Sequence, residues 1–126
     1  MHWQNIVLAL AGVAGGFVAV VHGVLVQRWL VRPIDELAAE GERMAGSTRR
    51  MVPLLFHFST VAWFLGGFAL IAAAFWFEPG ARLATALFVG ALYLYGAVGN
   101  LWATRGRHPG WMLMTVAVAL IAVGVS

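Results

Sequence analysis

Four long apolar segments constrain this chain more than any other feature of its sequence. Each is close to the roughly 20 residues that a helix needs to cross the hydrocarbon core of a bilayer. Their residues do not alternate strictly between apolar and polar, as membrane-spanning strands would. The sequence therefore predicts an all-α membrane protein, a single domain over residues 1–126, folded as a four-transmembrane-helix bundle with spans at about 5–27, 52–77, 83–103 and 109–126.

The composition agrees with a membrane protein and argues against a nucleic-acid partner. Hydrophobic residues make up 62% of the chain and charged residues 10%, whereas soluble domains carry about 25% charged residues. A chain of 126 residues has too much surface for its volume to hide that apolar area from water. All eight basic residues are arginines, and most flank the apolar segments, as topology determinants do. The expected partner is thus the lipid bilayer, with no nucleic acid.

The arginines also predict an orientation. Seven of the eight lie in the first and third connections, and the second connection holds only Arg82. Because positively charged loops stay in the cytoplasm, we expect both termini outside and the first connection, 28–51, inside. The expected location is a bacterial inner membrane.

The first connection is the only long one, and part of it has helical spacing. Pro33 suits the first turn of a helix, and Gly46, Ser47 and Thr48 are expected to end the helix before the second span. A short amphipathic cytoplasmic helix and a solvated linker helix are both open. The apolar positions at helical spacing are Ile34, Leu37, Ala38, Gly41 and Met44.

Small residues recur on one face of the first predicted span. Gly12, Gly16, Ala19 and Gly23 lie at steps of four, three and four residues, and Gly12 and Gly16 form a GxxxG motif. Such faces let helix backbones approach closely in lipid. The face can pack inside the bundle or form the interface of a homo-oligomer.

Three polar side chains fall at one predicted depth. At about 1.5 Å per residue, His22, His57 and Asn100 lie roughly 6–9 Å from the arginine-bearing ends of their helices. Polar residues inside a membrane are costly and usually face the bundle interior or a cavity. We expect a polar pocket near the cytoplasmic leaflet, with His22, His57, Thr60, Trp63, Tyr93, Asn100 and His108 as candidate ligand-binding residues.

Four interpretations of this layer stay open. It can be ordinary interhelical hydrogen bonding. It can be a pocket for a small or quinone-like molecule, with histidine donating and Tyr93 or Trp63 stacking. It can be a haem or metal site with His22 and His57 as opposed ligands, or a path for protons or ions. No Asp or Glu lies within a span, and no hydrolytic motif occurs, so no catalytic residues are expected.

A family resemblance covers nearly the whole chain. Segments 21–28, 57–67 and 99–111 resemble small bacterial inner-membrane proteins with four transmembrane helices. The resemblance implies the architecture and no particular activity. Among other four-span proteins, small multidrug-resistance transporters need a glutamate in the first span, which is absent here. Fluoride channels have a Phe-Ser-Thr motif in the third span, whereas Phe58, Ser59 and Thr60 lie in the second.

The function expected from the sequence is therefore a non-enzymatic, ligand- or partner-binding membrane protein. One alternative is a redox protein that holds haem or a metal ion at His22 and His57. The other is a small dimeric channel or transporter.

Overall fold

The computed structural model describes residues 2–41 and 45–126, and these residues are helical with no strand. The continuous run Trp3–Ala39, then α3 and α4, are each long and apolar enough to cross a membrane. The apolar helix α5 is shorter, with 16 residues. The all-helical prediction is thus confirmed, with three helices that qualify as membrane spans by length and composition. The elements are α1 (Trp3–Val26), the π-helix η1 (Gln27–Val31), α2 (Arg32–Ala39), α3 (Gly46–Phe75), α4 (Pro79–Thr104) and α5 (Gly110–Val125).

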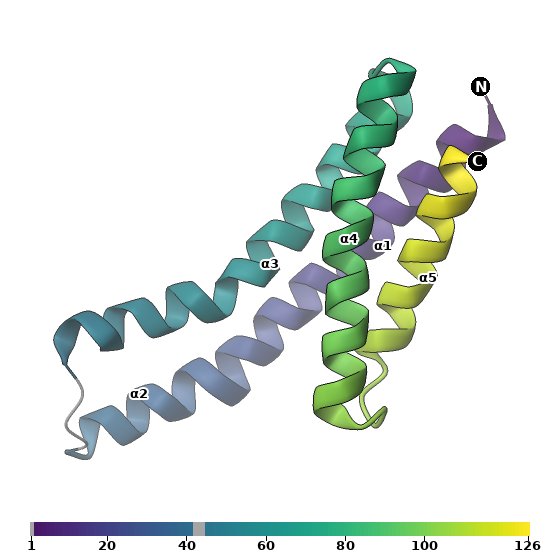
Figure 1. The fold of residues 1–126 in the computed structure, drawn as a ribbon. Helices are drawn as coiled ribbons and strands as arrows, with labels where there is room; N and C mark the ends of the chain where they lie inside the picture. Colours follow the sequence, from purple (N-terminus) through teal and green to yellow (C-terminus); the bar gives the residue numbers. More distant parts are fainter. Residues whose placement is uncertain (1, 42–44) are drawn as a thin grey trace.

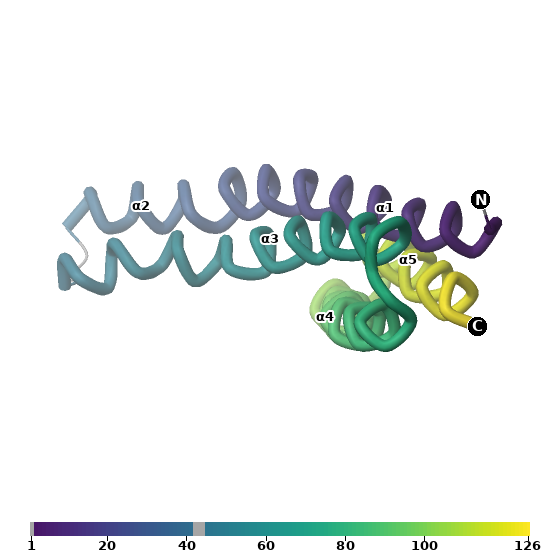
Figure 2. The backbone as a smooth tube through the Cα atoms, turned by 90° about the horizontal axis from the view of Figure 1, so that it is seen from above, coloured from purple at the N-terminus to yellow at the C-terminus, as the bar shows by residue number. Residues whose placement is uncertain are grey.

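A long antiparallel hairpin forms the frame of the molecule. One arm is α1 followed by η1 and α2, and the other arm is α3 (Figure 1). Helices α4 and α5 pack on the part of the hairpin near the chain termini, and α2 with the start of α3 extends beyond them (Figure 2). The hairpin and α4 therefore diverge at the end of α4 that leads into α5.

The first connection differs from the sequence prediction. Helix α2 does not stand apart, because it continues from α1 through η1 without a break. The π-helical turn directly precedes Pro33, whose ring would crowd the preceding turn of a regular α-helix. Residues 46–48 were expected to end a helix, but they begin α3 instead. The position of α2 relative to a membrane surface stays a prediction.

The tip of the hairpin lies earlier in the chain than expected. Helix α2 ends at Ala39, and Gly41 follows with φ 108°, a backbone conformation that glycine adopts readily. Arg49 Nε donates to Asp35 Oδ1 over 3.2 Å and so joins the two arms near this tip. The remaining predicted amphipathic position, Met44, lies outside the described residues, as do Glu42 and Arg43.

The small-residue face of α1 packs against α3 of the same chain. A Cβ atom on Gly12 would lie 2.5 Å from the backbone oxygen of Gly67, so only glycine permits this approach. Ala19 is fully buried, and a Cβ on Gly23 would meet Thr60. By contrast, a Cβ on Gly16 would meet no atom of the described residues within 4 Å. The face serves packing inside the chain, and a homo-oligomer stays a prediction.

Arg82 joins four helices near the chain termini. Its guanidinium, on α4, donates to Asn5 Oδ1 on α1 and to the carbonyl oxygens of Ala74 on α3 and Gly124 on α5, the last over 2.8 Å. The sequence identified Arg82 only as the lone arginine of its connection. The structure gives it a packing role as well.

Candidate functional site

A cavity of about 150 Å³ lies inside the molecule near the end of α4 that leads into α5. It is lined by four of the predicted site residues, His22, Trp63, Asn100 and His108. Its apolar walls include Val18, Leu113 and Met114. We call this cavity the polar pocket. Three helices and the α4–α5 connection each contribute one of the four residues, so the pocket depends on the tertiary fold.

His22 projects from α1 and is held on both sides by α3. Its ring lies 4.5 Å from the Trp63 ring, centroid to centroid, at an angle of 53°. Its Nε2 atom lies 2.9 Å from Ser59 Oγ, at hydrogen-bond distance. Sequence reasoning missed Ser59 as this partner. The available signal was its spacing, because Ser59 precedes Trp63 by four residues and so shares its helical face.

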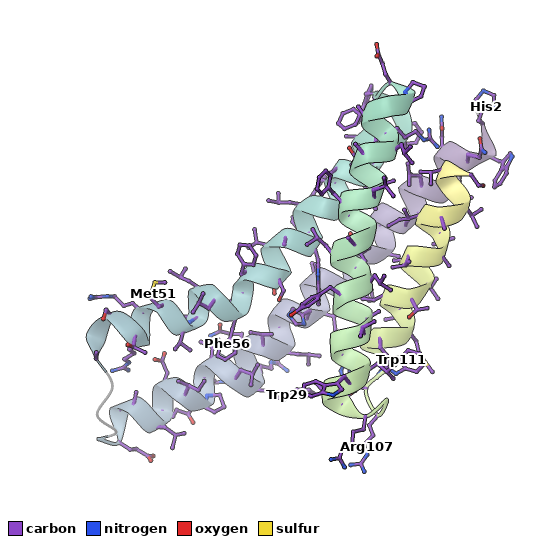
Figure 3. The ribbon with its side chains drawn as sticks, viewed as in Figure 1. His2, Trp29, Met51, Phe56, Arg107 and Trp111 are labelled. Atoms are coloured by element: carbon purple, nitrogen blue, oxygen red, sulfur yellow. The ribbon has the colours of Figure 1, made fainter. Side chains whose placement is uncertain are left out.

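His108 is oriented by the start of α5. The backbone N–H of Gly110 donates to His108 Nδ1 over 3.1 Å. When the imidazole is neutral, its proton must then lie on Nε2, which is a donor. The Trp29 ring of η1 stands edge-on to the His108 ring, with centroids 6.5 Å apart. Figure 3 shows Trp29 reaching from the hairpin toward the end of α4 near Arg107 and Trp111.

Asn100 provides the least satisfied polar group of the pocket. Its side-chain oxygen is buried and hydrogen-bonds to no group of residues 2–41 and 45–126. Leaving a buried acceptor without a partner costs about 1–3 kcal/mol. The amide lies beside Gly110, where a Cβ atom would come within 3.1 Å of Asn100 Nδ2. An unpaired amide that lines a cavity is what a site for a polar ligand atom requires.

Three predicted site residues lie outside the polar pocket. Tyr93 is fully buried and donates its hydroxyl proton to the backbone oxygen of Trp63 over 3.0 Å. His57 Nε2 lies 2.9 Å from Gln27 Oε1, and His57 and Thr60 line a different hollow beside Arg28. Equal depth therefore did not bring all the predicted polar residues together.

The two histidines considered for haem or metal line separate hollows. His22 lines the polar pocket and pairs with Ser59, whereas His57 lines the hollow beside Arg28 and pairs with Gln27. Within the described part of the chain, no group of three or more His, Asp or Glu side chains could hold a metal ion. The arrangement does not present His22 and His57 as opposed ligands across one cavity.

The polar pocket combines hydrogen-bonding groups with apolar walls. The Asn100 amide offers both a donor and an acceptor, and His108 offers a donor at Nε2 when neutral. Trp63 and Met114 supply buried apolar surface. Comparisons of the chain with protein-family models, curated proteins and solved structures find no match. The geometry of the pocket is therefore the basis for assigning a function.

Proposed function

We propose that this protein binds a small cyclic ligand bearing a carbonyl or hydroxyl oxygen in the polar pocket. The observation that carries this proposal is Asn100, which lines the cavity and whose buried side-chain oxygen has no partner among the described residues. A ligand hydroxyl donates to that oxygen, and a ligand oxygen accepts from His108 or from the Asn100 amide nitrogen.

The size and walls of the pocket favour a six-membered ring. An apolar cavity of about 150 Å³ is large enough for benzene, and the polar pocket has about this volume. Trp63 and Met114 contact the ring faces or edges, as aromatic and thioether groups do favourably. Ser59 pairs with His22 but does not line the pocket, so of this pair only His22 faces the ligand.

We also propose that all four apolar helices cross the membrane. Helix α5 forms the fourth span, at about 24 Å for its 16 residues. This is slightly short of the roughly 30 Å hydrocarbon core, which a bilayer accommodates by local thinning. The arginine-rich end, which carries the polar pocket, faces the cytoplasm of a bacterial cell.

Binding is tested with 4-methylphenol as the probe. Native protein in lipid nanodiscs should bind it by isothermal titration calorimetry, and Asn100→Leu should bind at least tenfold more weakly, because the oxygen that pairs with the hydroxyl is gone. Thr85→Val on the same helix is the control, since among residues 2–41 and 45–126 the Thr85 hydroxyl bonds only to the Ala81 carbonyl. Equal binding by native protein and Asn100→Leu would overturn the proposal.

Orientation is tested with single cysteines, because the chain has none of its own. Glu40→Cys marks the hairpin tip, and Glu78→Cys marks the α3–α4 turn; both side chains are exposed. A membrane-impermeant maleimide applied to intact spheroplasts should label Glu78→Cys, and it should label Glu40→Cys only after lysis. The reverse pattern would contradict the proposed orientation.

A further inference from the structure

A second hollow adjoins the polar pocket. This hollow, of about 370 Å³, also includes His22, Leu25, Asn100 and His108 among its lining residues. Because the two hollows share these four residues, they lie side by side, with Asn100 at the border of both. We call the second hollow the lateral groove.

The lateral groove has largely apolar walls of its own. Trp29 and Leu30 of η1 line one side, and Ala103 near the end of α4 lines the other. Trp29 is 63% exposed and Leu30 is 42% exposed, so this wall reaches the outer surface of the molecule. In a soluble protein such exposure would be costly. In the proposed membrane arrangement, Trp29 and Leu30 directly follow the first span, 5–27, so this wall lies at the edge of the bilayer.

The lateral groove lies at the end of the molecule where the hairpin and α4 diverge (Figure 1). Residues of η1 and of the end of α4 both line it. Trp29, which lines the groove, lies edge-on to His108, which lines both the groove and the polar pocket.

We infer that the ligand is a membrane amphiphile: an oxygen-substituted six-membered ring that carries a single hydrocarbon tail, such as an alkylphenol or a tailed quinone. This inference rests on the proposed function. The ring occupies the polar pocket at Asn100 and His108, and the tail lies in the lateral groove between η1 and α4. The ligand enters from the bilayer and never crosses water.

The two parts of the ligand are recognised differently. The ring gains hydrogen bonds that hydrocarbon cannot provide, so it supplies the affinity. The tail exchanges one apolar environment for another, so its burial adds little. The groove must therefore accommodate the tail, and a bulky side chain that fills the groove should exclude tailed ligands alone.

The test uses two probes, 4-methylphenol and 4-octylphenol, at matched mole fractions in nanodiscs. Ala103→Trp fills the groove from α4, and Leu30→Trp fills it from η1. Leu87→Trp is the control, because Leu87 is 65% exposed on α4 and does not line the groove. Both groove variants should lose at least tenfold in affinity for 4-octylphenol, and at least one should bind 4-methylphenol as native protein does.

Each other outcome has a distinct meaning. If native protein binds 4-methylphenol but not 4-octylphenol, the inference fails and the pocket takes a water-soluble ring. If both groove variants bind 4-octylphenol normally, or both lose the two probes equally, the tail does not use the groove and the inference fails. If native protein binds neither probe, the proposed function itself fails.

Discussion

The two halves of this bundle differ in how closely α4 lies against the hairpin (Figure 1). In the half near the chain termini, which we call the packed half, glycines bring helices together: a Cβ on Gly15 would overlap Tyr93, and one on Gly124 would lie 3.0 Å from Leu8. In the half toward the hairpin tip, which we call the pocket half, α4 and the hairpin diverge, and the polar pocket and lateral groove lie there.

The polar groups differ in the same way. In the packed half, Arg82 and Tyr93 donate to protein oxygens. In the pocket half, His22 pairs with Ser59 and His57 with Gln27. The side-chain oxygens of Asn100 and Thr60 there are buried and have no hydrogen-bond partner within 2–41 and 45–126. Polar groups that stabilise a membrane bundle are expected to be paired. The difference indicates that the packed half holds the fold together and that the pocket half is available for binding.

The largest loss in unfolding free energy is expected at the α1–α3 contact. Gly12→Ala forces a methyl group against the backbone oxygen of Gly67, which cannot move without shifting α3. We expect a loss of about 3 kcal/mol in unfolding free energy, at the upper end of overpacking effects. Gly16→Ala is the matched control, with open space at its Cβ, and should change the value by less than about 0.5 kcal/mol. The measurement is SDS titration in mixed micelles. Equal losses of unfolding free energy in the two variants would contradict the close contact between Gly12 and Gly67.

The next largest loss in unfolding free energy is expected at Arg82. Arg82→Leu removes hydrogen bonds to α1, α3 and α5 together. Charged hydrogen bonds contribute about 1.5–3 kcal/mol each when partners are buried, and Arg82 is half-buried, so we expect a total loss of about 2 kcal/mol in the same titration. Arg107→Leu, at an exposed position in the α4–α5 connection, is the control. If Arg107→Leu costs as much, Arg82 has no special packing role.

A smaller effect is expected at Tyr93. Tyr93→Phe keeps the ring that fills the core but removes the hydroxyl bonded to Trp63, at a cost of about 1 kcal/mol. Tyr95→Phe is the control, because Tyr95 is 80% exposed on the same helix. Thermal unfolding in detergent, followed by circular dichroism, compares the two. A Tyr93→Phe protein as stable as native would show that the bond carries no net stability.

The smallest effect distinguishes the two halves most sharply. Asn100→Leu removes a buried, unpaired side-chain oxygen and replaces the amide with an apolar group, so stability should stay the same or rise by up to about 1 kcal/mol. Thermal unfolding in the absence of added ligand measures this. A loss above 1 kcal/mol would mean that Asn100 is a packing residue like Tyr93, and that the two halves do not differ as argued.

Much of the fold could be predicted from the sequence, because a bilayer demands long apolar helices and these are visible as runs of residues. The position of the hairpin tip was harder to predict. Residues 46–48 have the composition of a break, yet they begin α3, and turn residues are found at Glu40 and Gly41 instead. Local composition could not choose between the two glycines, because contacts between the arms, such as Arg49 with Asp35, also influence where α3 begins.

The depth of the candidate site residues along their helices could be predicted from the sequence, but the direction in which each side chain points could not. Counting residues from the helix ends brought His22 and Asn100 to one level, and the structure places them in one cavity. The same count included His57, which faces Gln27 in another hollow. The direction of a side chain depends on how each helix is rotated. Long-range contacts such as Gly12 with Gly67 set that rotation, and they cannot be read from local spacing.

The most direct test of the central claim is to locate a bound ring. Crystals of the protein grown in lipid and soaked with 4-bromophenol can be measured at the bromine absorption edge. The account predicts an anomalous peak in the polar pocket, with the phenol oxygen within hydrogen-bond distance of Asn100 or His108, and no such peak in Asn100→Leu crystals. A peak elsewhere, or the same peak in both crystals, would contradict the claim that the unpaired Asn100 amide forms a binding site.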